Sequence, residues 1–274
     1  MVALCSLCLL GACAPSLSTF HTAAVPPKGH FAAAVGLEGS IPIGSIMDAI
    51  DAGKTMAKQA ESGQSLTTEE KWAVFDAGMQ LLLSPPSIGY HLSISYVPIE
   101  RLEMSLRYAG KALRLASRYQ LLDRSTGPFD LSAGVGVSRF TYAIPFSDKI
   151  PLLTVDDFKR WQIDVPLLLG MQNRWLRVWT GPRFVATFFD SVMHLDLMVE
   201  DPVLASMSGK AFYVGGQGGI GFGYRWVFVA FELTITRVIG SARFDAPVIV
   251  DAPSHSLDLS GFVIYPSFGL MGEF

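Results

Sequence analysis

Apolar residues alternate with polar or small residues in ten separate segments of this chain, and this period of two constrains the fold more than any other feature. The clearest segment is residues 87–97. Its apolar parity consists of Ile88, Tyr90, Leu92, Ile94 and Tyr96. Side chains two residues apart point to the same side of a β-strand, so each segment has one apolar and one polar face. About ten residues is also the length that a tilted strand needs to cross a bilayer.

The predicted strands follow one another along the chain. They are residues 30–42, 87–97, 101–108, 112–122, 129–142, 158–170, 174–188, 210–224, 226–239 and 257–274. In the last strand the parity slips near Ser260 and Gly261, which predicts a bulge or a later start.

The connections between these strands alternate in length, with one exception at residues 109–111. The long connections are residues 43–86, 143–157, 189–209 and 240–256. Bacterial barrels have short periplasmic turns and long outer loops, and an even number of strands leaves both termini at the short-turn end. We therefore expect an all-β fold with a helical insertion, built as an up-and-down transmembrane β-barrel of about ten antiparallel strands.

The composition is more apolar than that of an ordinary soluble domain. Of 274 residues, 50% are apolar and 16% are charged, where about 25% charged is usual. No run of about 18 apolar residues exists, so no transmembrane helix is predicted. The alternative fold is a lipid-anchored soluble β-sandwich or lipocalin-like barrel, which would hide the same apolar mass in a core. The formal charge of −3 gives no reason to expect nucleic acid as a partner.

Residues 43–86 are predicted to be a helical insertion in the first outer loop. Thr67 and Glu70 form the pattern of a capping box. An apolar stripe at helical spacing follows, consisting of Trp72, Phe75, Met79 and Leu82. We expect two helices that pack on each other and on the barrel rim, with a lid or plug as the alternative.

The two ends of the chain carry resemblances. Phe262, Ile264, Phe268, Leu270 and Phe274 share one parity. A strand with one apolar face and a terminal Phe resembles the last strand of outer-membrane β-barrels of Gram-negative bacteria. That resemblance implies a location in the cell outer membrane.

At the N-terminus, an apolar run leads to Leu10-Gly11-Ala12-Cys13, which resembles the lipobox of bacterial lipoproteins. The resemblance implies that residues 1–12 are a signal peptide and that Cys13 is acylated. Residues 13–28 would then be a lipidated periplasmic tether, followed by the barrel over residues 29–274. The alternative is an ordinary signal peptide in which Cys13 has no role. All three cysteines lie in residues 1–13, so no disulfide is expected in the barrel.

Ten charged residues fall on the inward parity of the predicted strands. They are Arg101, Glu103, Arg107, Arg114, Arg118, Asp130, Asp164, Arg177, Arg183 and Glu232. A barrel of about ten strands is narrow, and an unpaired buried charge costs several kcal/mol. We expect a structural network of ion pairs that closes the lumen. The alternative is a narrow passage or anion site lined by arginine.

His91 and Ser93 share a strand face, and Glu103 follows on the next predicted strand. This His-x-Ser pattern resembles the catalytic residues of outer-membrane phospholipase A and of the lipid A deacylase. The resemblance implies a serine hydrolase, since imidazole can take the hydroxyl proton when a third group orients it. A lone histidine among serines is more commonly a hydrogen-bonded lumen residue. We therefore expect no enzyme, and keep a lipid hydrolase using these three residues as a minor alternative.

No metal or cofactor motif stands out. The acidic residues of the outer loops form no compact run of the kind that gathers the six to eight oxygens of a calcium site. We expect a lipid-anchored barrel with a structural or interaction role in an envelope complex. Its partners would be outer-membrane lipid and other envelope proteins, bound through residues 43–86 and the outer loops. The alternative function is a narrow conduit or binder for a small apolar or anionic molecule.

Overall fold

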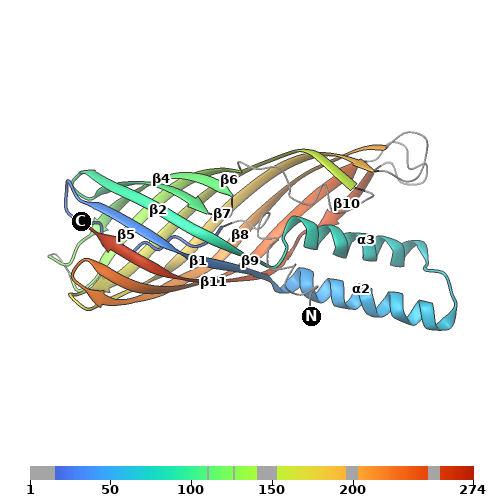
Figure 1. Ribbon diagram of the computed structural model, residues 1–274, viewed down its shortest axis with the longest axis horizontal. Helices are drawn as coiled ribbons and strands as arrows, with labels where there is room; N and C mark the ends of the chain where they lie inside the picture. The colour runs from blue at the N-terminus through green and yellow to red at the C-terminus, as the bar shows by residue number, and fades with distance from the viewer. Residues whose placement is uncertain (1–15, 110, 126, 141–152, 196–202, 246–253) are drawn as a thin grey trace.

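The computed structural model describes residues 16–109, 111–125, 127–140, 153–195, 203–245 and 254–274 (Figure 1). Its elements are β1 (Phe31–Pro42), α2 (Ile43–Ser62), α3 (Thr68–Leu83), β2 (Ser87–Ile99), β3 (Leu102–Ala109), β4 (Ala112–Leu122), β5 (Asp130–Phe140), β6 (Leu153–Gln172), β7 (Leu176–Leu195), β8 (Val203–Tyr224), β9 (Val227–Asp245), β10 (Ser254–Asp258) and β11 (Gly261–Glu273). The predicted signal peptide and Cys13 lie outside the described residues.

The strands form one closed antiparallel barrel of ten wall positions. Each of β1 to β9 pairs with the next strand along the chain, and β1 also pairs with β11, which closes the ring. The last strand pairs along β9 in two pieces, β10 with residues 241–245 and β11 with residues 227–238. The predicted ten-stranded barrel is confirmed, and the parity slip near Ser260 corresponds to the gap between β10 and β11.

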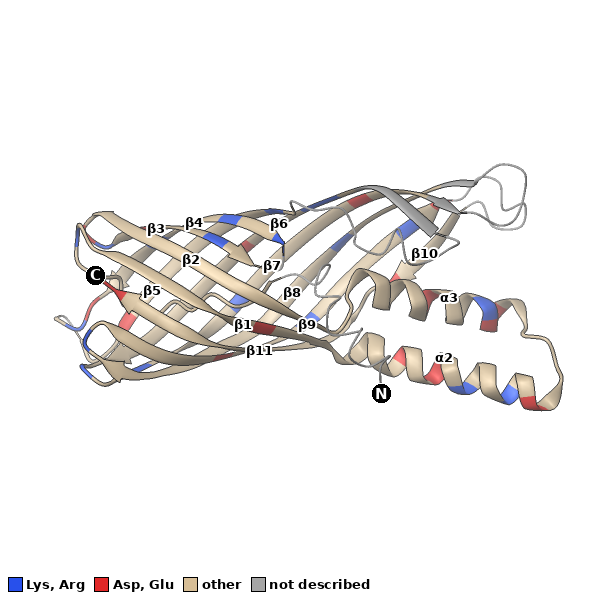
Figure 2. Cartoon of the chain, viewed as in Figure 1, with Lys and Arg blue, Asp and Glu red and all other residues tan. Residues whose placement is uncertain are grey.

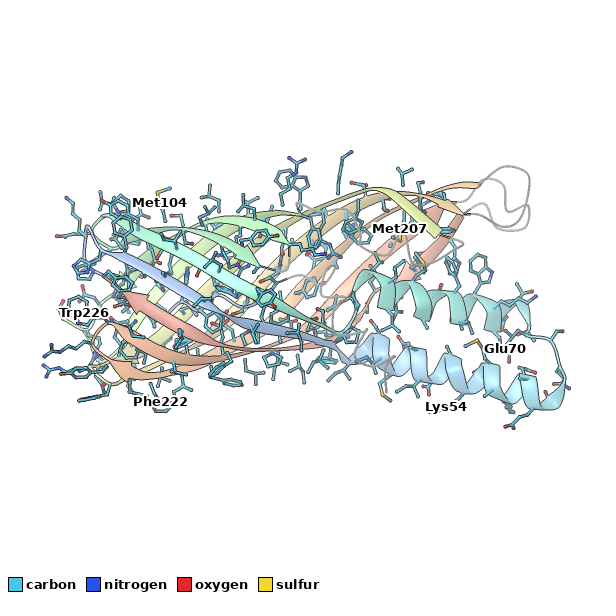
Figure 3. The ribbon with its side chains drawn as sticks, in the orientation of Figure 1. Lys54, Glu70, Met104, Met207, Phe222 and Trp226 are labelled. Atoms are coloured by element: carbon cyan, nitrogen blue, oxygen red, sulfur yellow. The ribbon has the colours of Figure 1, made fainter. Side chains whose placement is uncertain are left out.

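The wall has the inverted burial of a transmembrane barrel. Leu92 on the outward face of β2 is 59% exposed, while its neighbour Ser93 on the inward face is 6% exposed. Large apolar side chains cover the outside of every strand from β1 to β9 and of β11, and Figure 3 shows Phe222 and Trp226 pointing away from the barrel. This apolar outer face is the surface that membrane strands present to lipid.

The barrel wall is much taller on one side than on the other. Strands β6 to β9 have 19 to 22 residues, whereas β1 to β5 have 8 to 13. The prediction of a long loop over residues 189–209 was therefore wrong, because β7 and β8 continue through most of it. In Figure 1 the helical pair α2–α3 lies at the same end as the tall wall and beside it.

The helical insertion follows the sequence prediction closely. Thr67 and Glu70 form the capping box, since Thr67 Oγ1 accepts from the Glu70 N–H at 3.3 Å and the Glu70 carboxylate accepts from the Thr67 N–H at 2.8 Å. Among the described residues α2 and α3 are the helices, and neither has the length and apolarity to span a bilayer.

Helix α3 covers the inner face of the tall wall. Its Met79 and Leu83 belong to an apolar cluster together with inward residues of the upper strands. The wall residues of this cluster are Phe158, Phe189, Met193, Ala205, Met207, Ala242, Phe244 and Leu257. This packing explains why the inward parity is apolar near the loop end and polar lower down.

Candidate functional site

The segment before β1 lies inside the barrel and fills it. We call residues 16–24 the plug. Leu17 and Ser18 have no exposed surface, and Phe20 is 2% exposed. The prediction that residues 13–28 form a periplasmic tether is therefore wrong for residues 16–24, because this segment is buried against inward-facing side chains.

Glu232 on β9 is the main contact of the plug. Its carboxylate accepts hydrogen bonds from the Thr19 N–H at 2.7 Å and from the Phe20 N–H at 3.1 Å. It also accepts from the indole Nε1 of Trp179 on β7 at 3.2 Å. Gly219 lies opposite Trp179 in the β7–β8 register, and a Cβ there would overlap the indole ring. The glycine therefore makes the space in which Trp179 supports Glu232.

Other inward side chains hold the remaining backbone of the plug. Ser16 donates from Oγ to Glu38 Oε2 at 3.0 Å, and its carbonyl oxygen accepts from Arg107 at 3.4 Å. Arg118 donates to the carbonyl of Thr22. The plug is neither helix nor strand, so its backbone groups have no regular partners, and a buried polar group without a hydrogen bond is costly. The lumen charges therefore act as the hydrogen-bonding partners of the plug.

Ion pairs fill the lumen beside the plug. Asp164 on β6 accepts two hydrogen bonds from Arg114, both at 2.7 Å, and one from Arg183 at 3.1 Å. Gly136 makes this possible, because a Cβ there would lie 2.5 Å from both Arg114 Nε and Asp164 Oδ1. Two further pairs join strands at other levels. They are Arg118 with Glu103 and Arg177 with Glu273.

The structure places nine of the ten predicted lumen residues in the lumen, each no more than 6% exposed. They are Glu103, Arg107, Arg114, Arg118, Asp130, Asp164, Arg177, Arg183 and Glu232. The prediction was wrong for Arg101, which lies in the β2–β3 turn with a φ of 68°. Its side chain is 43% exposed and pairs with Asp123 at 2.6 Å outside the lumen.

His91 and Ser93 do lie together, but with a different acid from the one predicted. His91 Nε2 is 3.2 Å from Ser93 Oγ, and its Nδ1 is 3.4 Å from Glu38 Oε2. Glu103 pairs with Arg118 instead. The ring of Phe20 packs edge-on against His91 at 4.8 Å between centroids, so the plug covers this group. The prediction of Glu103 as the third member was wrong because β1, not β3, brings the carboxylate to Nδ1.

Two small cavities lie along the lumen. One of about 40 Å³ lies beneath the helical insertion, and one of about 20 Å³ lies beside Arg118 and Arg177. These volumes suit one or a few water molecules. No cluster of three metal-ligating side chains occurs among the residues that the structure describes.

Sequence reasoning missed two acids and the plug. Glu38 and Glu273 lie on the inward parities of β1 and β11, so the period-two rule could have found both. The plug carries no such signal, because its small polar residues show neither strand nor helix periodicity.

A separate groove opens on the lipid-facing side, between β1 and β11. The register pairs Glu38 with Ser267 and Ile41 with Ile264, and the pairing is interrupted in between. Pro266 lies at the interruption and has no N–H to donate. The groove has a volume of about 570 Å³. Its apolar lining consists of Leu37, Ile41, Ile88, Phe231 and Phe268.

No protein-family model matches this chain, and no curated protein matches it. Among solved structures, it is similar to the outer membrane protein OprG from Pseudomonas aeruginosa, with 10% identity, a TM-score of 0.40, and coverage of 90% of this chain and 97% of that one. It is also similar to a major outer membrane protein from Thermus thermophilus, with 8% identity, a TM-score of 0.36, and coverage of 89% and 99%. A third similar structure is Ail, the attachment invasion locus protein of Yersinia pestis, with 10% identity, a TM-score of 0.30, and coverage of 90% and 99%.

Proposed function

We propose that this chain is a closed outer-membrane barrel that holds a helical pair on the outer side of the membrane for a partner protein of the cell envelope. The observation that carries the proposal is the filled lumen. The plug, the ion pairs and the apolar cluster under α3 leave cavities of about 40 and 20 Å³. A conduit needs a continuous path, so the working surfaces of this barrel are on its outside.

The loop lengths support the proposed orientation. The turns after β2, β4, β6 and β8 are short, and the chain enters β1 and leaves β11 at that same end, where the Phe31 N–H bonds to the Phe274 carbonyl at 2.9 Å. Barrels of bacterial outer membranes have their short turns in the periplasm. In this orientation α2, α3 and the tall wall lie on the outer side.

A lipid anchor on Cys13 would hold the N-terminal segment at the periplasmic leaflet, whereas the contacts of the plug hold residues 16–24 inside the lumen. Ser16 contacts Glu38, which is seven residues from Phe31 at the barrel rim. With the rise and tilt of barrel strands, that is roughly 18 Å of depth. Three residues span at most about 11 Å. An acyl chain on Cys13 can therefore enter the periplasmic leaflet only if the plug leaves the lumen.

Labelling with palmitate tests the anchor separately from the barrel. Acylation of Cys13 predicts that labelled palmitate enters the wild-type protein and not the Cys13→Ala variant, and the labelled protein would have its plug outside the lumen. Labelling that is absent from both proteins would exclude the anchor and leave the closed barrel unchanged.

Helix α2 offers the surface for a protein partner. None of its residues is buried, whereas α3 buries four. Ile43, Met47 and Ile50 form one stripe at helical spacing and are 39%, 51% and 46% exposed. Methionine adapts its shape to a contact surface. The stripe begins directly after β1 ends at Pro42. We propose that an apolar surface of an envelope protein covers this stripe.

Crosslinking in intact cells tests this surface. We expect a photoreactive residue at position 47 to capture a partner, and Met47→Lys with Ile50→Lys to abolish capture by a probe placed at position 43. The matched control is Asp48→Lys with Asp51→Lys, which adds the same lysines to α2 without changing the stripe. Equal capture by both double variants would contradict the proposal.

The groove at Pro266 favours a second candidate function, the binding of a small apolar molecule or acyl chain from the membrane. The groove is lined by apolar side chains and is closed on its inner side by Glu38 and Ser267. We expect Gly39→Leu, which fills the groove, to weaken the binding of a fluorescent fatty acid. Val137→Leu, on the lipid face of β5, is the control.

We do not propose that His91 and Ser93 catalyse hydrolysis. Ser93 is 6% exposed and His91 has no exposed surface, so a lipid ester has no route to the hydroxyl while the plug is present. Phospholipid hydrolysis that disappears in Ser93→Ala would restore the enzyme hypothesis.

A further inference from the structure

Charged residues end the apolar outer face at the same side of five neighbouring strands. On each strand from β5 to β9 the outward parity is apolar from the short-turn end upward and then changes to a charged residue. The first charged residues are Arg139 on β5, Lys159 on β6, Asp190 on β7, Lys210 on β8 and Arg237 on β9. Four of these five are cations, although the chain has a formal charge of −3. With Arg243, which lies further along β9 on the same outward parity, we call the cations the basic girdle.

The strand register connects two of these cations, Arg139 and Lys210, with aromatic residues of the outer face. Arg139 is opposite Trp161, which is opposite Phe188, which in turn is opposite Lys210. The Arg139 guanidinium lies 5.3 Å from the centre of the Trp161 ring. Aromatic side chains on a barrel wall mark the boundary between hydrocarbon and headgroups. Together with the end of the apolar outer face on each strand, these aromatic residues indicate that the basic girdle begins at headgroup depth.

A shallow depression of about 430 Å³ lies within the girdle, between Lys210 and Arg243. The register explains it, since Lys210 is opposite Ser241 and Ser208 is opposite Arg243. Ser256 adds a third hydroxyl, and Phe188 forms the apolar edge toward the membrane. This depression therefore combines two cations and three hydroxyls, which suit an anionic group, with an apolar edge, which suits the acyl chains of a lipid.

Arg243 is available to such a ligand. It pairs with Asp245 at 3.0 Å, but the two side chains are 68% and 37% exposed. An exposed ion pair of this kind is worth about 1 kcal/mol or less. A phosphate offers a stronger, charge-assisted interaction to the same guanidinium. Asp190 also lines the depression, and Asp245 lies beside it as the partner of Arg243. Lys210, Arg243 and Lys159, which is opposite Asp190 in the β6–β7 register, together outweigh these two negative charges.

The two ends of the barrel carry their cations differently. At the short-turn end Arg101, Arg174 and Arg225 lie in the turns, beyond the strands. At the other end the girdle cations lie on the wall itself, within strands β5 to β9. Figure 2 shows Lys and Arg in blue both in the short turns and along the strands. In the proposed orientation the girdle faces the outer leaflet of an outer membrane, whose lipid is a phosphorylated, acylated sugar.

We propose that the basic girdle is a binding surface for the phosphate groups of this outer-leaflet glycolipid, with the depression between Lys210 and Arg243 as its main phosphate site. The acyl chains would lie along the apolar wall below Phe188. The proposal rests on the orientation given above, but not on the helical pair or its partner.

Binding of purified lipid A to the purified protein in a neutral detergent tests this surface, with native mass spectrometry as the readout. We expect Lys210→Glu with Arg243→Glu to weaken binding by about tenfold or more, as the loss of two charge-assisted contacts implies. Lys210→Gln with Arg243→Gln should weaken it less. The matched control is Arg174→Glu with Arg225→Glu, which makes the same charge change at the short-turn end and should bind like wild type.

Two comparison lipids distinguish recognition of the phosphorylated glycolipid from general binding of acylated or acidic lipids. Dephosphorylated lipid A should bind wild type as weakly as the Lys210→Glu, Arg243→Glu variant binds lipid A. Phosphatidylglycerol should bind more weakly than lipid A. Equal affinities of the girdle and control variants for lipid A, or equal affinities of wild type for lipid A and either comparison lipid, would overturn the proposal. Because the assay omits the envelope partner, its failure is distinguishable from failure of the partner hypothesis.

Discussion

Asp164 holds two arginines in the middle of the lumen, and its side chain is only 2% exposed. Its inward position follows from the period of two, as do the positions of Arg114 and Arg183. Parity alone could not predict that Asp164 pairs with these two arginines. The pairing depends on which strands are neighbours and on the space that Gly136 leaves for the side chains. The period of two placed Arg101 wrongly because β3 begins only at Leu102. Arg101 is a turn residue with positive φ, so strand parity does not apply to it.

Removing this carboxylate should be costly. We expect Asp164→Ala to lower the free energy of unfolding by about 3–5 kcal/mol, because two buried guanidinium groups lose their partner. The control is Arg101→Gln, which breaks an exposed pair and should cost about 1 kcal/mol or less. Urea unfolding in lipid vesicles measures both. Similar costs for the two variants would contradict a dry, closed network.

At the scale of elements, the strands were predicted with the correct faces, but the four tall strands β6 to β9 were predicted too short at the end away from the short turns. Sequence reasoning ended the seventh strand at Phe188 because the outward parity turns polar at Asp190. The strand continues because its inward parity stays apolar at Phe189 and Met193, which pack in the cluster under α3. Where the strand leaves the membrane, its outward face becomes polar and its inward face becomes apolar. A rule that follows the apolar lipid-facing residues therefore loses the strand at that point.

The lipid face itself can be tested by adding a charge. We expect Leu92→Arg, at the middle of β2, to cost about 2–4 kcal/mol of unfolding free energy, because a guanidinium enters hydrocarbon. Ser206→Arg, on the outward face of β8 above the girdle, should cost about 1 kcal/mol or less. If Ser206→Arg proves as damaging as Leu92→Arg, the membrane boundary does not lie at the girdle.

The helical pair should respond to acid. The N–H of Thr67 and the amide of Gln59 donate to Glu70, and these bonds hold the pKa of its carboxyl below the usual range. Because the folded pKa is depressed, the stabilisation is complete above the ordinary pKa of glutamate and is lost as the pH falls through the folded value. We expect hydrogen exchange at residues 64–70 to quicken in that acidic range in wild type and to be pH-insensitive, after correction for intrinsic rates, in Glu70→Gln.

At the scale of the whole molecule, the sequence predicted a ten-stranded barrel with a closed lumen, and the barrel is what the fold shows. The means of closure was only partly predictable. Ion pairs fill part of the lumen, but the inward faces also carry small residues such as Ser93 and Ser132, whose side chains are too short to fill the middle of the barrel. The plug occupies that space, and its serine, threonine and alanine residues resemble a tether in composition alone.

The most direct test of a closed barrel is the conductance of the purified wild-type protein in a planar bilayer. We expect no steady conductance, because Glu232 and Glu38 hold the plug in the lumen and the two cavities beside it, among the described residues, measure about 40 and 20 Å³. Deletion of residues 16–24 should produce open channels in the same assay. Steady conductance of the wild type, equal to that of the deletion variant, would contradict the closed lumen and favour a conduit lined by Arg107 and Arg114.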